Sequence, residues 1–563
     1  MKHITVSSTQ MTKRTKLLDI LGSFPMLESL QMNVAAGHET PVSNGFQGHR
    51  TLKRIDSNSS VFVEKALRSC GNLESIVLPY MVEDFDNTSR DLSTILRLGS
   101  NLKHVEIENP EFSALDAPSS VMDVPLLTLA LSSLTNEALD ALPQWFTQVH
   151  FRHLTNLSLD GDYLHLPRDF ILSTNTSCSS LSTLKLKYCT LAPNHLIELT
   201  QMQNLKHISL GKCDAWFYSS TIPDSAPTSN VIDDADDEDL FGHHEDSSSK
   251  ISYAELIFYV TSNLPNLLSL HLNQCVFNAL PQTYLKQDLI TPHPLQSLKV
   301  FDTTDPRISN PELYQILASF PKLKSLRLDV ACDVFYDSTL FSESLPDLKT
   351  LELRGSKPYE LTNYDHKPTG ASNYDKLDSL SLWAAPQAFL LRFLENTAIS
   401  SNLAHLCLNY MPVESSLPRF ELKSLKFLEI RTIGSTANII CTRMLDSLTS
   451  SSAGLIHLEL GAFKRGSSFF PISSLKTLAS RCQRIKILKF TNFQLGNDAF
   501  VSHRKLKAFK LSVGGIDSAG VRVGSIVSND SLQLAIEGLG FSGRSAVVRQ
   551  SRMSDLDAYK RYK

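Results

Sequence analysis

The chain of 563 residues lacks any apolar run long enough to cross a bilayer. A transmembrane helix needs about 20 predominantly apolar residues, and no stretch of the sequence supplies them. The opening residues, MKHITVSSTQMTKRTKLLDIL, do not show the basic start, apolar core and small-residue cleavage site of a secretory signal. We therefore expect no membrane partner.

A large net charge of either sign is also missing. The chain carries 54 Lys and Arg against 58 Asp and Glu, which gives a formal net charge of −4. Proteins that bind nucleic acid or anionic membrane surfaces generally carry a clear excess or cluster of positive charge. The balance therefore predicts that nucleic acid is not a partner.

Closely spaced cysteine pairs are absent, although the chain has nine cysteines. A structural zinc site or a compact disulfide framework requires close pairs such as CxxC, and none occurs. The cysteines recur instead at fixed places in a longer pattern, which favours small buried packing residues. Reduced thiols without a secretion signal predict a cytoplasmic or nuclear location.

Signatures of catalysis are not found either. The sequence has no GxxxxGK[ST] phosphate loop, no GxGxxG turn after a strand, no HExxH motif and no GxSxG turn. Ser, His and Asp are abundant, but no spacing singles out a catalytic triad. We expect a protein that is not an enzyme and that uses neither a cofactor nor a metal ion.

What the sequence contains in abundance is one leucine pattern, clearest in residues 311–332, PELYQILASFPKLKSLRLDVAC. Its first half places four apolar residues at i, i+3, i+4 and i+7, the spacing of one helix face. They are Leu313, Ile316, Leu317 and Phe320. The LxxLxL run from Leu323 to Leu328 then ends in the alternation of a strand with one buried face. A helix followed almost directly by a strand is one turn of a leucine-rich repeat.

The pattern recurs along the whole chain, and we take the first apolar residue of each LxxLxL as the anchor of its repeat. Spacings run from 21 residues (Leu52 to Leu73) to 30 (Leu425 to Leu455), apart from one gap of 62 (Leu205 to Leu267). The anchors are Leu27, Leu73, Leu102, Leu126, Leu154, Leu181, Leu205, Leu267, Leu295, Leu323, Leu348, Leu377, Leu403, Leu425, Leu455, Ile485 and Leu506, with Leu52 a weaker one. The helical spacing recurs as well, as in residues 63–70 before Leu73.

One repeat buries too little apolar surface to offset the conformational entropy of ordering it, so repeats must stack on one another. We therefore predict an α/β leucine-rich-repeat solenoid over residues 1–542, with about 19–20 irregular repeats. The solenoid is expected to be a horseshoe, with a parallel sheet on its concave face and helices and loops on its convex face.

Three further features concern the ends of the chain and the widest gap. Residues 219–250 are rich in Ser, Pro, Asp and Glu and predict a disordered insertion, which serves either as a solvated spacer or as an acidic docking or phosphorylation segment. Residues 543–563 predict a basic C-terminal tail or cap. Met1, Ile4 and Val6 fit LxxLxL, so the chain is expected to open inside a repeat. Either an upstream segment is missing, which we favour, or a partner covers that end.

Candidate binding residues come from the positions that face away from the buried leucines, at offsets +2, +4 and +6 from each anchor. Large aromatic side chains next to Arg on such a face are typical of contact hot spots. The candidates in the repeats from Leu267 to Leu425 are His271, Asn273, Lys299, Phe301, Arg327, Arg354, Trp383, His405, Phe427 and Arg431, and His207 shares their columns. The alternative is that a few aromatics occur there by chance or pack on their neighbours.

Several segments resemble the cysteine-containing leucine-rich repeats of F-box proteins, which are ribonuclease-inhibitor-like in fold. They are LRSCGNLESIVL (67–78), LKLKYC (184–189) and LASRCQRIKILKF (478–490), and LTNEALDAL (134–142) is similar to that family's ITDxGL segment. The resemblance implies the substrate receptor of an SCF-type, cullin-based ubiquitin ligase, in which the concave face holds the protein substrate. The chain departs from the family because no F-box precedes the repeats, so adaptor and cullin are expected partners only if an F-box lies upstream.

The expected function is therefore a non-catalytic protein-recognition module, the substrate-binding part of such a ligase receptor, acting as a monomer. Two alternatives stay open. One is a stand-alone scaffold or inhibitor that forms a one-to-one complex without ubiquitin transfer. The other is a GTPase-activating protein, which would need a catalytic Arg or Asn at the rim of the repeats.

Overall fold

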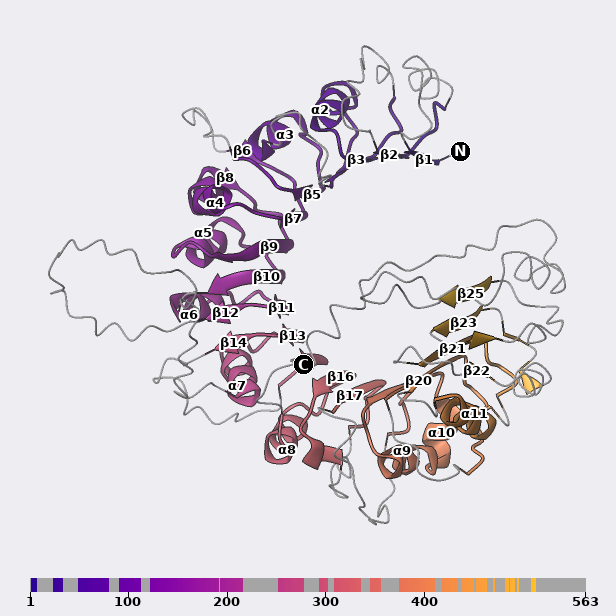
Figure 1. Cartoon of the computed structure of the whole chain (residues 1–563). Coiled ribbons are helices and arrows are strands. Elements are labelled where there is room, and N and C mark those ends of the chain that lie inside the picture. Colours follow the sequence, from indigo (N-terminus) through magenta and orange to yellow (C-terminus); the bar gives the residue numbers. More distant parts are fainter. Residues whose placement is uncertain are drawn as a thin grey trace, which may run out of the picture. The chain divides into compact units, whose positions relative to one another are not determined.

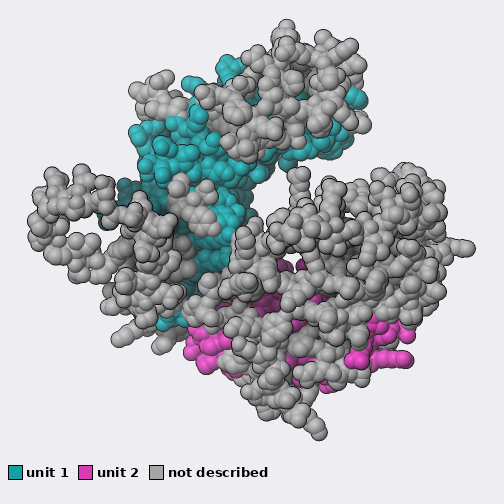
Figure 2. Space-filling view, in the orientation of Figure 1, with its two compact units in different colours: residues 1–288 teal, residues 289–563 magenta. Residues whose placement is uncertain are grey.

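The computed structural model describes most of the repeats and divides the chain into two compact units, unit 1 (Met1–Asp288) and unit 2 (Leu289–Lys563) (Figures 1 and 2). The predicted insertion at 219–250 and the predicted tail at 543–563 lie outside the described residues. The described residues are 2–7, 24–33, 49–79, 91–112, 122–191, 193–215, 252–277, 293–301, 308–335, 345–355, 374–410, 418–432, 437–449, 452–462, 469–470, 481–482, 484–485, 487–491, 494–495 and 508–512.

Unit 1 is a parallel sheet with helices along one of its faces (Figure 1). Each main strand pairs in parallel with the next one along the chain. These strands are β1 (His3–Ser7), β2 (Ser29–Asn33), β3 (Arg54–Ser57), β4 (Ser75–Leu78), β5 (His104–Glu108), β7 (Thr128–Ser132), β9 (Asn156–His165), β10 (Thr183–Leu191), β11 (His207–Gly211) and β13 (Ser269–Asn273). The helices are α2 (Ser60–Ser69), α3 (Leu92–Leu98), α4 (Asn136–Gln148), α5 (Phe170–Ser177), α6 (Pro193–Thr200) and α7 (Tyr253–Asn263).

Short strands extend the repeats: β12 (Asp214–Ala215) and β14 (Val276–Phe277) belong to the main sheet, whereas β6 (Met122–Asp123) and β8 (Val149–His150) form a separate two-stranded sheet. β12 pairs with β10 and with β14, and β6 pairs with β8. All of these pairs are parallel, as expected for repeats that stack in one direction.

Unit 2 repeats the same construction. Its main strands are β15 (Ser297–Phe301), β16 (Ser325–Asp329), β17 (Thr350–Arg354), β18 (Ser379–Trp383), β19 (His405–Asn409), β20 (Phe427–Thr432), β21 (His457–Ala462), β23 (Ile487–Thr491) and β25 (Ala508–Ser512), each parallel to the next. A short pair, β22 (Phe469–Phe470) and β24 (Gln494–Leu495), lies apart from the main sheet. The helical segments are α8 (Asn310–Ser319), the 3₁₀ turn η3 (Cys332–Phe335), α9 (Gln387–Leu394), α10 (Thr397–Asn402) and α11 (Ala437–Leu448).

The anchors form the core, as the leucine pattern predicts. Every anchor from Leu27 to Ile485 is at most 2% exposed, and Leu506 lies outside the described residues. Along β17 the residues alternate between buried leucines and half-buried polar groups. Because successive strand side chains point to opposite faces, one sheet face packs on the helices and the other does not. We call the second face of each unit its open face. This arrangement is an α/β leucine-rich-repeat fold.

Helices precede the strands as the sequence predicts, and side-chain caps stabilise the first turn of some of them. The LxxLxL anchored at Leu323 follows α8, in which Leu313, Ile316 and Leu317 are buried. In α7 the Glu255 amide donates to Ser252 Oγ at 3.2 Å, and the Ser252 amide donates to Glu255 Oε2 at 3.0 Å. This reciprocal pair satisfies two of the amides that a helix start leaves without partners.

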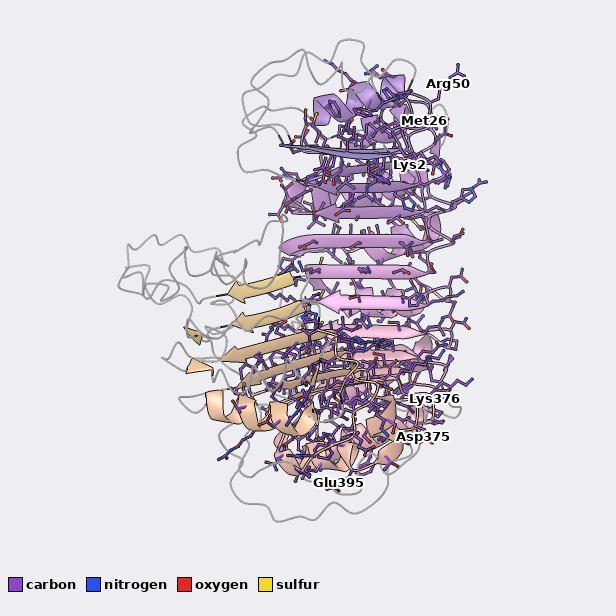
Figure 3. All side chains as sticks on the ribbon, turned by 90° about the vertical axis from the view of Figure 1, so that its right-hand side faces the viewer. Lys2, Met26, Arg50, Asp375, Lys376 and Glu395 are labelled. Atoms are coloured by element: carbon purple, nitrogen blue, oxygen red, sulfur yellow. The ribbon has the colours of Figure 1, made fainter. Side chains whose placement is uncertain are left out.

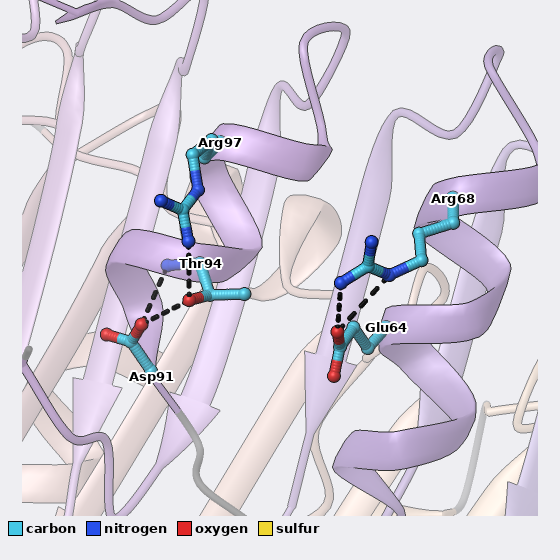
Figure 4. Close-up of polar contacts among 5 residues, drawn as sticks. All are labelled: Glu64, Arg68, Asp91, Thr94 and Arg97. Carbon is cyan, nitrogen blue, oxygen red and sulfur yellow. Dashed lines mark hydrogen bonds and ion pairs between the residues drawn. The ribbon is translucent and has the colours of Figure 1, made fainter.

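Polar contacts on α2 and α3 support the helices locally (Figure 4). On α2, Arg68 Nη2 lies 2.6 Å from Glu64 Oε1, four residues earlier. At the start of α3, Asp91 accepts the amide of Thr94 at 3.0 Å and also its hydroxyl, and Arg97 Nη2 donates to Thr94 Oγ1 at 3.3 Å. The exposed Arg68–Glu64 pair contributes only about 0.3–0.5 kcal/mol and the Asp91 cap typically about 1 kcal/mol, so the packed leucines carry most of the stability.

A column of asparagines ties five of the repeats to the preceding one at the edge where the strands begin. The Asn just before an anchor donates from Nδ2 to the carbonyl two residues before the preceding anchor. The pairs are Asn72 with Arg50 (2.8 Å), Asn101 with Gly71 (2.5 Å), Asn204 with Ser179 (2.9 Å), Asn266 with Gln203 (3.4 Å) and Asn402 with Asp375 (2.7 Å). Figure 3 labels Arg50 and Asp375, two of these acceptors, at the strand-entry edges of their units.

The cysteines are buried free thiols, as predicted, except that Cys407 is half-exposed and the side chain of Cys332 is not described. Cys213 Sγ donates to the Leu186 carbonyl at 3.5 Å, and Cys275 Sγ donates to the Leu210 carbonyl at 3.3 Å, each in the preceding repeat. Burial raises the pKa of the Cys178 thiol to about 12. Such thiols stay protonated at neutral pH and serve packing rather than chemistry.

A buried histidine gives unit 1 a predicted pH dependence. His195 on α6 is buried, and its Nε2 lies 2.8 Å from the Pro167 carbonyl and 3.2 Å from that of Arg168. Burial lowers the pKa of His195 below 6.5, and the backbone contacts and the carboxylate of Glu198 offset part of this effect. Below about pH 6.5 the unfolded chain therefore binds a proton that the folded unit refuses.

We expect unit 1 to lose stability as the pH falls through that range, by up to about 1.4 kcal/mol per pH unit from this group. Urea unfolding at several pH values would measure the slope, and a His195→Gln variant should show a flatter one. Equal slopes in the two proteins would contradict the assignment.

Candidate functional site on the open face of unit 2

The register of the sheet aligns equal offsets of successive repeats in rows across the open face of unit 2. Residues that are 22–30 positions apart in the sequence thereby become direct neighbours, as Arg354 and Trp383 do. The +4 row runs Lys299, Arg327, Glu352, Ser381, Cys407, Glu429 and Glu459. The +6 row runs Arg354, Trp383, Asn409 and Arg431, and the +2 row includes His405, Phe427 and His457.

Four side chains form what we call the arginine stack: Phe301, Arg354, Trp383 and Tyr410. The guanidinium carbon of Arg354 lies 3.8 Å from the ring centroid of Phe301 and 4.6 Å from that of Trp383. Tyr410 meets the Trp383 ring edge-on at 5.5 Å. Arg354 Nε and Nη2 donate to Glu352 Oε1 at 2.9 and 2.7 Å. The guanidinium is therefore held in one orientation by two rings and a carboxylate.

Phe301 corrects one expectation of the sequence analysis, which counts its ring among exposed aromatics. The residue is only 8% exposed. The Lys299 ammonium lies 4.7 Å from its ring centroid, and the Arg354 guanidinium lies over the same ring. The side chains of Lys299 and Arg354 thus cover the Phe301 ring, which lies between them and the sheet. For this residue, packing on neighbours is the correct alternative, whereas Trp383 and Phe427 are half-buried.

A second group of charges surrounds Arg431. Its Nε lies 2.6 Å from Glu429 Oε1 and its Nη2 lies 3.1 Å from Glu459 Oε1. Burial lowers the pKa of Arg431, but the two carboxylates outweigh that effect and raise it. Burial raises the pKa of the neighbouring Cys407 thiol to about 12, and the Glu429 carboxylate adds to this shift. Cys407 is therefore not a nucleophile at neutral pH.

The third row brings together His405 and Phe427, both predicted, with His457. The Phe427 ring centroid lies 6.1 Å from that of His405 and 4.6 Å from that of His457. His405 is exposed and the other two are half-buried. This row supplies a partly apolar strip beside the charged +4 row.

The predicted residues of unit 1 lie in a different setting. Register places His207 beside Ser269 and His271 beside Ser209, and His271 Nε2 lies 3.1 Å from Ser269 Oγ. Asn273 is exposed at the end of β13. Small polar residues occupy many positions on this open face, among them Ser75, Thr128, Ser132, Ser158 and Ser209. No Phe, Tyr or Trp stands at offsets +2, +4 or +6 of the described strands β9, β10, β11 and β13.

The acidic partners and Tyr410 are not among the residues predicted from the sequence. Glu352, Glu429 and Glu459 stand at offset +4, so the column that revealed Lys299 and Arg327 already contained them. Tyr410 follows the end of β19 at offset +7, where the chain turns with φ 58°. Every non-glycine residue with positive φ in the described ranges occupies that offset: Asn109, Ser133, Tyr188, Lys212, Gln274, Ala384 and Tyr410. A turn of the backbone, which alternation does not predict, places Tyr410 against Trp383.

Candidate metal clusters and helices able to span a membrane are both absent from the described part of the chain. Its His, Cys, Asp and Glu side chains form no group of three or more that could hold a metal ion. None of its helices is both long and apolar enough to cross a membrane.

Comparisons with known proteins point to solved structures only. No family model matches the sequence, and no curated protein matches it. The crystal structure of a TLR13–ssRNA13 complex is similar at 16% identity and a TM-score of 0.36, covering 92% of this chain and 78% of that one. CroV588, described as a novel circular LRR protein, is similar at 13% identity and a TM-score of 0.34, covering 91% and 69%. Because both TM-scores are below 0.5, the fold class rests on the repeat geometry of the chain itself.

Proposed function

We propose that the chain is a non-catalytic protein-recognition module that holds a segment of a partner protein on the open face of unit 2. The arginine stack carries this proposal. Trp, Tyr and Arg are the side chains that most often dominate the energy of protein contacts. Here they pack together on the sheet face that the helices leave uncovered. The stack is also preformed, because Glu352 and the two rings already fix Arg354, so binding orders little that was mobile.

The contrast with unit 1 supports the choice of surface. Both open faces carry Ser and Thr at offset +2, and in unit 1 the Lys187 and Lys212 ammonium groups lie over the Tyr188 ring. Of the described strands, however, only those of unit 2 present large aromatic side chains at offsets +2 to +6, namely Phe301, Trp383 and Phe427. Small polar groups contribute little to a contact, while partly buried aromatics with fixed cations form its energetic centre.

A double variant tests the placement of the site. We expect Trp383→Ala with Arg354→Ala to lower affinity for the partner by roughly 30-fold or more, since hot-spot truncations cost about 2 kcal/mol or more each. Affinity purification of the tagged full chain from its native source, followed by quantitative mass spectrometry, would identify proteins that the double variant no longer captures. Lys185→Ala is the matched control, because Lys185 is exposed at offset +4 on the open face of unit 1. Equal capture by all three proteins would reject this placement.

We further propose that the recognised protein is a substrate for ubiquitin-dependent degradation and that the chain is the substrate-binding part of an F-box-like receptor. What supports this is the column of cysteines, because Cys213 and Cys275 each bond to a carbonyl of the preceding repeat. The segments that resemble cysteine-containing F-box repeats include one of this column, LKLKYC at 184–189. Adaptor and cullin enter this proposal only through an F-box upstream of the repeats.

The same purification distinguishes the ligase proposal from a stand-alone scaffold or inhibitor. A ligase receptor should co-purify with adaptor and cullin, and the captured partner should acquire ubiquitin in a reconstituted reaction. A scaffold should form a stable one-to-one complex and support no ubiquitin transfer. Recovery of a partner without adaptor, cullin or transfer would remove the ligase proposal and leave protein recognition standing.

A further inference from the structure

Two cations face each other on adjacent strands beside the arginine stack. The register of β15 and β16 pairs Lys299 directly with Arg327, and both side chains lie half-buried on the open face. Neighbouring strands are about 4.8 Å apart, and like charges directly opposite each other destabilise a sheet. A fold selected for stability alone would place an acid or a neutral residue at one of these positions.

The described residues compensate the charge of this pair only in part. The side chains of Lys299 and Arg327 make no hydrogen bond within the described part of the chain, and Arg327 Nε lies 3.9 Å from Glu352 Oε2. Glu352 already accepts two hydrogen bonds from Arg354. Counting Lys299, Arg327 and Arg354 against Glu352 and the buried Asp329 leaves a net charge of +1.

The lowered pKa of Lys299 is consistent with this surplus of positive charge. Burial lowers the pKa of Lys299, and the positive charge of Arg327 lowers it further, while Glu352 acts in the opposite direction. Its ammonium lies over the Phe301 ring at 4.7 Å, a contact that orients the charge but accepts no hydrogen bond.

We propose that Lys299 and Arg327 bind a carboxylate of the partner segment, so that the module selects an acidic peptide stretch. This inference rests on the proposed function and names the chemistry of its partner. A carboxylate between the two cations relieves their repulsion and accepts hydrogen bonds from both. Trp383, two strands farther along the sheet, offers a half-buried ring to a neighbouring apolar residue of the same segment.

The sheet also sets the spacing of these two partner residues. Two strands across and two residues along the strand correspond to roughly 10–12 Å between Arg327 and Trp383. An extended peptide covers that distance in roughly three to four residues. The preferred segment thus carries Asp or Glu about three to four residues from an aromatic or aliphatic side chain.

A random peptide library displayed on phage and selected against the full chain provides the probe. We expect the selected peptides to be enriched in Asp or Glu at that distance from an apolar residue. One selected peptide is then synthesised with its acid intact and with the matching amide, Asn or Gln. The amide version should bind roughly 10- to 100-fold more weakly by fluorescence polarisation.

Variants of the chain test whether Lys299 and Arg327 cause this loss of affinity. Lys299→Gln with Arg327→Gln should weaken the acidic peptide by a similar factor and bind the acid and amide peptides about equally. The matched control is Lys376→Gln, which removes an exposed ammonium of unit 2 that pairs with Asp347 at 2.6 Å instead. The control should keep the full preference for the acid.

A stability readout separates binding from a structural role. The double variant removes a like-charge pair but also the Lys299–Phe301 contact and the Arg327–Glu352 ion pair, so its unfolding midpoint without peptide should stay close to that of the wild-type chain. A clear drop in midpoint would show that these side chains hold the fold together, and it would overturn the inference.

The outcomes also separate this inference from the proposed function. If selection yields no binder, no acidic enrichment, or peptides whose amide versions bind equally well, the carboxylate site is wrong. Peptides without acids that still lose affinity on Trp383→Ala would leave protein recognition by this face intact. Peptides that bind the wild-type chain and every open-face variant equally would contradict both.

Discussion

Replacing Phe301 by alanine is expected to lower the free energy of unfolding of unit 2 by about 3 kcal/mol, near the lower end for a buried Phe. The ring is 8% exposed and lies beneath both the Lys299 ammonium and the Arg354 guanidinium. Its removal leaves a cavity at the end of β15 and deletes two cation–π contacts, each worth about 0.5–2 kcal/mol. Equilibrium unfolding in urea, followed by circular dichroism, would measure the loss.

Two further variants serve as comparisons for Phe301→Ala. Phe301→Leu keeps most of the apolar volume and loses the ring face, so it should cost clearly less than the alanine variant. Trp383→Ala should show the reverse profile, with a smaller loss of stability and a larger loss of partner binding, because Trp383 is only half-buried. A Phe301→Ala variant as stable as the wild type would mean that the ring does not support the stack.

Replacing Trp145 by alanine should have the largest effect in unit 1, about 3–5 kcal/mol of unfolding free energy. The indole of this α4 residue is 3% exposed. Its ring centroid lies 5.4 Å from that of Phe112, 5.6 Å from Phe146 and 5.1 Å from Phe151. Its Nε1 donates to Ser93 Oγ of α3 at 3.1 Å, which joins two consecutive helices. The variant therefore loses apolar packing, ring contacts and a buried hydrogen bond together.

Trp145→Phe is the matched variant, since it keeps an aromatic ring in the cluster and removes only the indole N–H and part of the volume. We expect a cost of about 1–3 kcal/mol, in the range of a lost buried hydrogen bond. Urea unfolding monitored by circular dichroism compares the three proteins. Equal costs for the alanine and phenylalanine variants would assign the effect to the hydrogen bond and contradict the packing argument.

The repeats themselves could be predicted because the pattern that builds them is local. Leu323, Leu326 and Leu328 lie within six residues, and alternation along a strand puts the last two on one face whatever the rest of the chain does. The same holds for Leu313, Ile316 and Leu317 on one side of α8. Each of these predictions depends only on the geometry of one strand or one helix, and burial confirms each of them.

The candidate site was predictable in part. Reading equal offsets in successive repeats singled out Lys299, Arg327, Arg354 and Trp383, which the register does place side by side. The same reading could not show that Phe301 is covered, because its burial comes from long side chains that fold over it from positions 299 and 354. Side-chain direction depends on partners across strands, and offsets carry no information about it.

The asparagine column shows the same limit at the level of the backbone. Asn72 and Asn402 each stand just before an anchor, and each donates to a carbonyl of the preceding repeat, that of Arg50 and that of Asp375. The residues are plain in the sequence, but their acceptors are backbone atoms that become neighbours only after the repeats stack. The contact therefore depends on the alignment of successive turns.

The amino-acid sequence alone determined the repeating helix-strand unit, its buried leucines and the columns from which binding residues come, because these follow from spacings within a single turn. Only the tertiary structure decided which of those residues touch. It placed Arg354 between two rings, assigned Glu352 to it and set Lys299 opposite Arg327. The physical reason is that register across a parallel sheet is set jointly by many loops and helices of unequal length, while burial within a strand is set by its own alternation.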